Sequence, residues 1–92
     1  MDDLNTYADA FVQAVAAELR AERAARKLTF KALVATTGLH ETTLVRYFKG
    51  ERDIPMTMLA KICRGLGVDP STLLDDAAKR VERSQHRGGA DA

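Results

Sequence analysis

The sequence predicts an all-α fold for a single small domain, and three observations support this class. The chain has 92 residues, 46% of them apolar, and it is rich in alanine, leucine, arginine and glutamate, which favour helices. Apolar side chains recur every three to four positions, the spacing of one helix face. No segment alternates like a strand, and no internal repeat is present. A chain of this length buries roughly 60–65% of its extended surface, which is enough for one core.

The first two helices are predicted over residues 5–27 and residues 29–37. In the first, apolar side chains repeat at helical spacing, and acidic residues precede basic ones, as the helix dipole favours. In the second, Thr29 is the expected N-cap and Gly38 the stop. The residues of the second helix expected to face inward are Phe30 and Leu33.

Three more helices are expected after the turn at Gly38. The third covers residues 41–48, and residues 49–55 form a loop because a glycine and a proline interrupt the pattern. The fourth helix follows this loop and ends at Gly67, and the fifth begins where Asp69 precedes a first-turn proline. The expected inward-facing residues of the last two helices are Leu59, Ile62, Cys63, Leu66, Leu73, Leu74, Ala77, Ala78 and Val81.

Several classes of function find no support in the sequence. No apolar run approaches the ~20 residues that span a bilayer, and Met1 leads into two aspartates, so we expect a cytoplasmic protein without membrane contact. Cys63 is the only cysteine, so we expect a small buried apolar group and no zinc cluster. The two serines and two histidines form no recognisable catalytic arrangement. We therefore expect no enzyme activity, no metal and no cofactor.

Charge is distributed unevenly along the chain. The net charge is +1, but residues 1–18 hold four acidic side chains and no basic one, whereas residues 19–64 hold ten Lys or Arg against four Asp or Glu. The middle of the chain therefore suits a polyanionic partner. Charged residues also commonly do no more than solvate a helix face, so charge alone leaves this ordinary explanation open.

The turn at Gly38 separates two short helices, an arrangement typical of a helix-turn-helix. Helices joined by about three residues around a glycine cross at a steep angle. A helix of this size fits the ~12 Å major groove of B-DNA, and its N-terminal residues come closest to the base edges. The short or polar side chains of Glu41, Thr42 and Thr43 suit that approach. Residues expected on the inner side of the two helices are Leu33, Leu39, Leu44 and Tyr47.

The stretch from Leu19 to Leu74, about 56 of the 92 residues, resembles the XRE family of lambda-repressor-like and Cro-like DNA-binding domains. The resemblance rests on LRAERAARKLT, on Leu33 and Gly38 followed by Leu44, on KGERDIP, and on LAKICRGLGVDPSTLL. It implies a lambda-repressor-like five-helix domain that binds double-stranded DNA operators as a homodimer.

The resemblance also implies which residues contact DNA. The base-reading positions are Glu41, Thr42 and Arg46, and the expected backbone contacts are Thr43, Lys49 and Arg52, to which we add Lys31 and His40. The alternative for Arg46 is a solvated arginine on an exposed helix, and the threonines could simply favour a first turn. Glu41 suits a helix N-terminus, but phosphates repel it unless it accepts a hydrogen bond from a cytosine amino group.

Five residues depart from the family pattern: Phe30, Val34, Thr37, His40 and Phe48. Phe30 stands where a phosphate-binding glutamine is frequent, and Phe48 stands where a glutamate often pairs with the arginine at the position of Arg23. We expect Arg23 to find another partner or to stay hydrated, because an isolated buried charge is costly. His40 replaces the usual serine or threonine cap, so we expect a poorly satisfied helix start.

The N-terminal segment lies largely outside the resemblance. We predict an N-terminal helical extension over residues 1–18, a helix-turn-helix domain over residues 19–84 and a disordered tail over residues 85–92. The extension can pack on the fifth helix, pair with a second copy or bind another protein. Its apolar stripe, the candidate dimer or partner surface, consists of Leu4, Tyr7, Phe11, Val12 and Val15.

The sequence thus predicts a sequence-specific regulator of transcription that reads the DNA major groove with residues 41–48. We expect a repressor of bacterial or phage type. The alternative is an antitoxin-like or other protein-interaction module that uses the apolar N-terminal helix.

Overall fold

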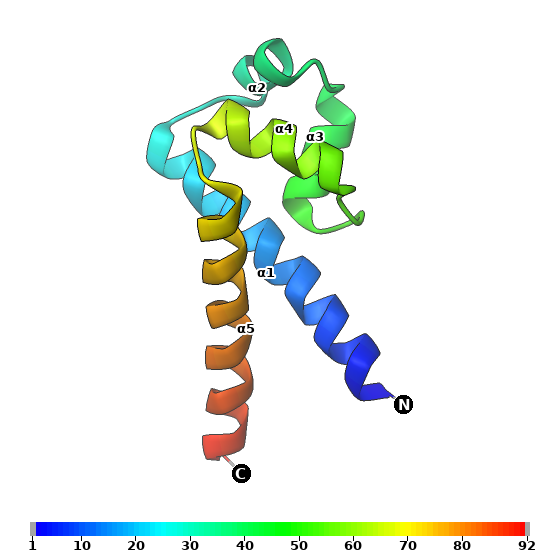
Figure 1. Ribbon diagram of the computed structural model, residues 1–92, viewed down its shortest axis with the longest axis vertical. Helices are drawn as coiled ribbons and strands as arrows, with labels where there is room; N and C mark the ends of the chain where they lie inside the picture. The colour runs from blue at the N-terminus through cyan, green and yellow to red at the C-terminus, as the bar shows by residue number, and fades with distance from the viewer. Residues whose placement is uncertain (1, 92) are drawn as a thin grey trace.

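A computed structural model describes residues 2–91, with side chains described for residues 3–84. Within the described residues there are five helices and no strand, which confirms the all-α prediction. The helices are α1 (Asp2–Arg26), α2 (Phe30–Thr37), α3 (Glu41–Lys49), α4 (Met56–Leu66) and α5 (Pro70–Asp91). Figure 1 shows α2, α3 and α4 gathered at one end, while α1 and α5 cross beneath them and diverge towards the two termini.

The helix boundaries follow the predicted local signals. Thr29 caps α2 by accepting a hydrogen bond from the backbone N–H of Ala32 at 3.0 Å, and Asp69 accepts one from Ser71 at the start of α5, also at 3.0 Å. Gly38 ends α2 with a left-handed φ of 76°, which a residue with a Cβ adopts only at a cost. Local sequence therefore places the two helices of the helix-turn-helix.

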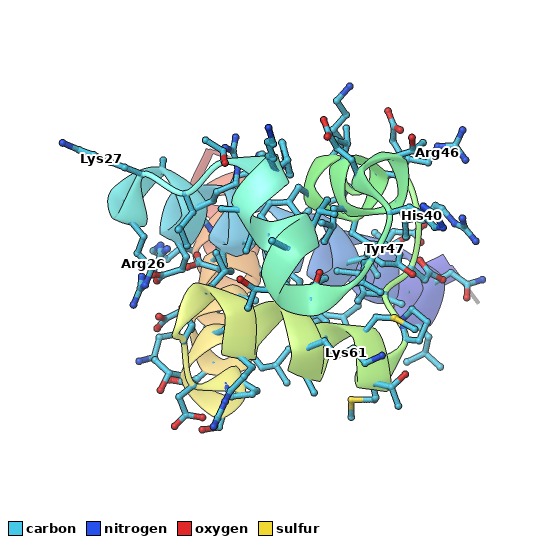
Figure 2. All side chains as sticks on the ribbon, turned by 90° about the horizontal axis from the view of Figure 1, so that it is seen from above. Arg26, Lys27, His40, Arg46, Tyr47 and Lys61 are labelled. Carbon is cyan, nitrogen blue, oxygen red and sulfur yellow. The ribbon has the colours of Figure 1, made fainter. Side chains whose placement is uncertain are left out.

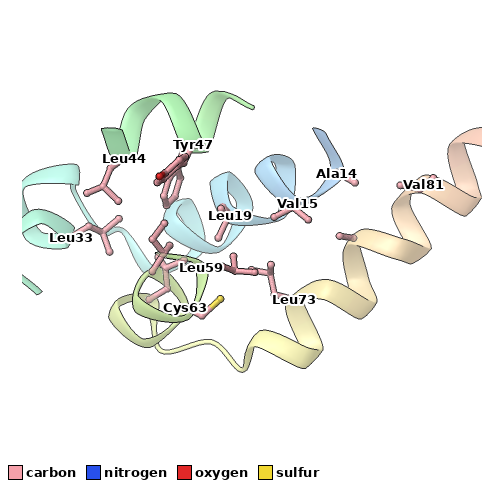
Figure 3. Packing of buried hydrophobic residues seen from close by; sticks show 14 residues of the cluster. Ala14, Val15, Leu19, Leu33, Leu44, Tyr47, Leu59, Cys63, Leu73 and Val81 are labelled. Atoms are coloured by element: carbon pink, nitrogen blue, oxygen red, sulfur yellow. The ribbon is translucent and has the colours of Figure 1, made fainter. Parts of the chain in front are cut away.

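One contiguous core joins all five helices. All five helices contribute buried apolar side chains to it, and the contribution of α5 includes Leu73 and Ala77. Figure 3 shows this core running from Leu33 and Leu44, between α2 and α3, to Ala14 and Val81, between α1 and α5. The largest side chains that are completely enclosed are Phe48, Leu19, Leu33, Leu44, Ile62, Leu73 and Cys63.

The second half of the predicted N-terminal extension belongs to this core. Ala14 and Val15 are only 5% and 7% exposed. Glu18 is also buried, and its carboxylate accepts a hydrogen bond at 2.6 Å from Nε of Arg80 in α5. A boundary at residue 18 therefore falls inside a continuous helix that packs on α5, and Val15 is corrected from a surface residue to a core residue.

The start of α1 is exposed, as expected for a surface. Leu4 and Tyr7 are 77% and 46% exposed, while Phe11 and Val12 are half-buried. At the other end of the chain, the helical backbone of α5 continues to Asp91, beyond the point where the sequence suggested that order ends. Disorder of residues 85–92 in solution stays a prediction. Over the described residues, every helix is too short or too polar to cross a membrane.

Candidate nucleic-acid interface

The turn between α2 and α3 is fixed by backbone and side-chain hydrogen bonds. The Gly38 N–H donates to the carbonyl of Val34 at 2.9 Å, and the Leu39 N–H donates to the hydroxyl of Thr37 at 3.2 Å. Leu33 and Leu44 are buried on the inner side of the two helices. The predicted inward set holds, since Tyr47 is also buried and Leu39 is half-buried. The apolar inner side thus fixes which face of α3 turns outward.

The outward face of α3 carries the predicted base-reading residues. Glu41, Thr42 and Arg46 are exposed, while Thr43 is half-buried. Figure 2 shows Arg46 reaching outward at the edge of the molecule and Tyr47 pointing inward from the same helix. The first turn of α3 therefore presents short side chains to solvent, with one long cation a turn further on.

The predicted backbone-contacting residues other than Thr43 are exposed as well. Lys31, Lys49 and Arg52 are exposed, as is His40 at the start of α3. Among the residues with described side chains, the ion pairs are Glu22–Arg26, Asp75–Lys79 and Glu18–Arg80, and none of them uses these cations. The positive charges on this side of the molecule are therefore available to an external anion. Carboxylates are also present there, at Glu41, Glu51 and Asp53.

The start of α3 lacks a side-chain cap. His40 has extended backbone at the N-cap position and makes no side-chain hydrogen bond to the helix. This agrees with the expectation from the sequence. The free N–H groups and the positive end of the α3 dipole consequently face outward, an arrangement that favours an anion.

Phe30 and Phe48, the two aromatic departures from the family pattern, form the surroundings of the Arg23 guanidinium. The Arg23 guanidinium lies 4.2 Å from the ring centroid of Phe30, and Phe30 meets Phe48 edge-to-face at a centroid distance of 5.3 Å. The guanidinium also donates to the carbonyl of Leu28 at 3.0 Å. Its Nε is buried without a partner. A cation–π contact and one carbonyl thus replace the ion pair expected from the family pattern.

Two residues of α1 that the sequence analysis did not single out hold the far end of α3. Nη1 of Arg20 donates to the carbonyl of Phe48 at 2.6 Å. Nε2 of Gln13 donates to the carbonyl of Gly50 at 2.8 Å. These partners are 28 and 37 residues apart in sequence. No local sequence signal therefore points to them; only their seven-residue spacing on a helix hints at a shared face.

The described residues show no alternative chemical site. They contain no group of three or more His, Cys, Asp or Glu side chains arranged to bind a metal. Cys63 is buried, and burial, followed by the nearby Asp69 carboxylate, raises the pKa of its thiol. Because a raised pKa disfavours the thiolate, Cys63 acts as a small apolar core residue.

Comparisons with known proteins agree with this arrangement. The family described as "Helix-turn-helix domain" matches residues 14–77. A crystal structure of the clp gene regulator ClgR from Corynebacterium glutamicum is 26% identical, with a TM-score of 0.71 over 76% of this chain and 91% of that one. A second ClgR crystal structure is 22% identical, with a TM-score of 0.80 over 88% and 86%. Comparison with curated protein sequences gives no match.

The matched region begins within α1 and ends within α5, so it includes the whole helix-turn-helix and the helices that support it. The second ClgR structure shows that the fold is the lambda-repressor-like one, since it superposes over most of the chain. The chain belongs to the helix-turn-helix domain family and is a DNA-binding regulator of transcription, not an enzyme.

Proposed function

We propose that this protein is a sequence-specific regulator that inserts the N-terminal half of α3 into the major groove of double-stranded DNA. The observation that carries the proposal is the exposed first turn of α3, which lacks a side-chain cap and lies in a segment whose exposed cations take part in none of the ion pairs among the described side chains. Glu41, Thr42 and Arg46 are the base-reading residues of this proposal. Arg46 has the reach for a guanine edge, while Thr42 suits closer contacts.

The surrounding residues suit contacts with the sugar–phosphate backbone. Lys31 lies on α2, Lys49 is the last residue of α3, and Arg52 lies in the loop that follows, so exposed cations come both before and after the first turn of α3 in the chain. Thr43 and His40 complete the proposed backbone set. Contacts of this kind fix the register of a protein on the duplex, and base contacts then select the sequence.

We propose repression as the mode of regulation. A repressor can act by occupying its operator, which requires only DNA binding, and the outward face of α3 is the surface proposed to bind DNA. The structurally similar ClgR is a gene regulator from a bacterium, which favours a bacterial or phage setting for this chain.

We further propose that the protein binds its operator as a homodimer through the exposed start of α1. Leu4 and Tyr7 project from that end, beside a groove of ≈ 340 Å³ lined by Phe11, Val12, Ile54, Met56 and other residues. Tyr7 stacks on Phe11 at a centroid distance of 6.3 Å, and Leu4 precedes Tyr7 at helical spacing, so these side chains form one apolar patch of the kind that marks interaction surfaces. The same surface supports the second candidate function, binding to a different protein in the manner of an antitoxin.

The test of the proposed function is the salt dependence of binding to a duplex of random sequence. Four to six phosphate contacts predict that log K falls with log salt with a slope of about −4 to −5, at about 0.9 per phosphate neutralised on B-DNA. Fluorescence anisotropy of a labelled duplex between low and moderate salt measures this slope. A flat response would remove DNA binding and leave the protein-interaction candidate.

A further inference from the structure

We propose that Arg20 and Gln13 are positioning residues that set the pose of the DNA-reading helix α3 from the side of α1. This inference rests on the proposed function, because it concerns how the same helix is held for DNA. Neither residue belongs to the expected DNA-contacting set. Their role is to complete the hydrogen bonding at the C-terminal end of α3, opposite the end that meets the bases.

The two side chains share one face of α1. They are seven residues apart, which is almost two full helical turns, so both point towards α3. Arg20 donates to the carbonyl of Phe48 at 2.6 Å, and Gln13 donates to the carbonyl of Gly50 at 2.8 Å. The two hydrogen bonds therefore connect α1 to the end of α3 and to the first residue of the following loop.

These contacts satisfy carbonyls that the helix itself leaves free. The last carbonyls of an α-helix have no partner within the helix. Those of Arg46 and Tyr47 accept from the backbone of Glu51 and Gly50, at 2.9 Å and 3.1 Å. The next carbonyl, of Phe48, has the Arg20 guanidinium as its donor. A positive charge at this end also complements the negative end of the α3 dipole.

A helix as short as α3 depends on such contacts for its orientation. It has nine residues, and isolated helices of that length are marginal in water. Its inner face is fixed by Leu44, Tyr47 and Phe48 in the core. Core packing fixes which face of α3 turns inward, and the two long-range hydrogen bonds add two fixed points at its C-terminal end, so they restrict the tilt of the helix axis.

Gly50 fits the same interpretation. It has a left-handed φ of 75°, and a Cβ at this position would lie 2.5 Å from Oε1 of Gln13. The glycine therefore allows the backbone turn and also leaves room for the Gln13 side chain to reach the carbonyl. At Gly38, which has nearly the same φ, a Cβ would meet no atom within 4 Å, so the close packing at Gly50 is not a general property of the helix ends in this fold.

The first experiment separates positioning from phosphate contact at Arg20. The variants are Arg20→Met, Arg20→Lys, which keeps a charged donor, and the control Arg83→Met on exposed α5. Affinity is measured for a duplex selected from a random library and for random duplex, across salt. We expect Arg20→Met to lower the ratio of the two affinities roughly five- to tenfold without changing the salt slope, Arg20→Lys to restore part of it, and Arg83→Met to leave the ratio unchanged.

A phosphate contact at Arg20 would give a different result. Affinity for both duplexes would fall together, and the slope of log K against log salt would become shallower by about 0.9. That outcome overturns the proposal and leaves the proposed function intact. Absence of binding by the unaltered protein would instead remove the proposed function.

The second experiment needs no DNA, so it tests whether Arg20 and Gln13 hold the end of α3 even if the unaltered protein does not bind DNA. Gln13→Glu keeps the size of the side chain but removes its donor, and Asn5→Asp makes the same change of charge elsewhere on α1. Amide hydrogen exchange reports the opening of the α3 end. We expect Arg20→Met and Gln13→Glu to raise the exchange rates of the Gly50 and Glu51 amides about tenfold, with the amides of Leu73 and Ala77 unchanged. Unchanged rates at Gly50 and Glu51, or equal rises in all four, would overturn the proposal.

Discussion

Arg23 is a half-buried cation, and its surroundings show how aromatic side chains can take the place of a carboxylate. The guanidinium lies over the face of the Phe30 ring, and Phe48 packs against that ring edge-to-face. A ring cannot neutralise the charge as a glutamate would, but it costs little to desolvate. The Nε of Arg23 is buried without a hydrogen-bond partner, so the aromatic rings do not replace every hydrogen bond that a carboxylate could accept.

The cluster predicts a measurable coupling between Arg23 and Phe30. Replacing Phe30 with Leu keeps an apolar side chain but removes both the ring face and the edge-to-face contact, so we expect a loss of about 1–2 kcal/mol of stability. In a double-mutant cycle with Arg23→Met, measured by urea denaturation, the two changes are expected to couple by about 0.5–2 kcal/mol. Strictly additive losses would show that the ring and the cation do not interact.

The exposure of the proposed base-reading residues was predictable from sequence, and the long-range hydrogen-bond partners of α3 were not. Glu41, Thr42 and Arg46 lie where the helix period and the Gly38 turn place them. Arg20 is different, since its carbonyl partner depends on how α1 and α3 meet in space. The sequence showed that Arg23 needed a partner, but it did not reveal that the two aromatic departures supply one together.

At the scale of elements, α2 and α3 differ in how they begin. The α2 start has a threonine cap with a hydrogen bond at 3.0 Å, whereas the α3 start has a histidine with none. A capping side chain contributes about 1 kcal/mol to stability. The α3 start therefore gives up stability at the place where the protein is proposed to meet DNA.

This difference predicts opposite effects of two cap substitutions. His40→Ser places a hydroxyl where the backbone already has the extended N-cap conformation, so we expect a gain of about 0.5–1 kcal/mol in unfolding free energy. Thr29→Ala removes an existing cap and is expected to cost about 1 kcal/mol. Chemical denaturation of both variants checks the pair. A destabilised His40→Ser protein would mean that the histidine stabilises the helix start in another way.

Element boundaries were largely predictable because the caps and stops are local. The α2 prediction was accurate at its end because Gly38 adopts the left-handed conformation there. The beginning of α1 was less well defined, since the helix starts at Asp2 and not near residue 5. Acidic residues at a helix start are tolerated over several positions, so they locate a boundary only loosely.

At the scale of the whole molecule, the helix-turn-helix lies at one end and the termini extend away from it (Figure 1). The predicted division at residue 18 falls within α1, and the middle of this helix, at Ala14, Val15 and Glu18, is buried against the rest of the fold, as the alternative of packing on the fifth helix expected. The sequence pattern shows that a helix is amphipathic but not which neighbour covers its apolar face. Leu4 and Tyr7 lie beyond the covered part and stay exposed.

The dimer proposal is tested best by point substitutions, since removing residues 1–15 would also remove Ala14 and Val15 from the core. We expect the double variant Leu4→Ser/Tyr7→Ser to shift a dimer to a monomer in light scattering, because it removes the apolar contact area. Both side chains are exposed, so the melting temperature of the monomeric fold is the control and is expected to stay the same. An unchanged molar mass in a protein that is dimeric would place the interface elsewhere.

The central claim, that the exposed face of α3 reads base edges, is tested most directly by the affinity of Arg46→Ala for two duplexes. One duplex is selected from a random library by the unaltered protein, and the other has random sequence. The account predicts a loss of about 1–3 kcal/mol on the selected duplex and little change on the random one. Unchanged affinity for both duplexes, or an equal loss on both, would contradict base reading by Arg46.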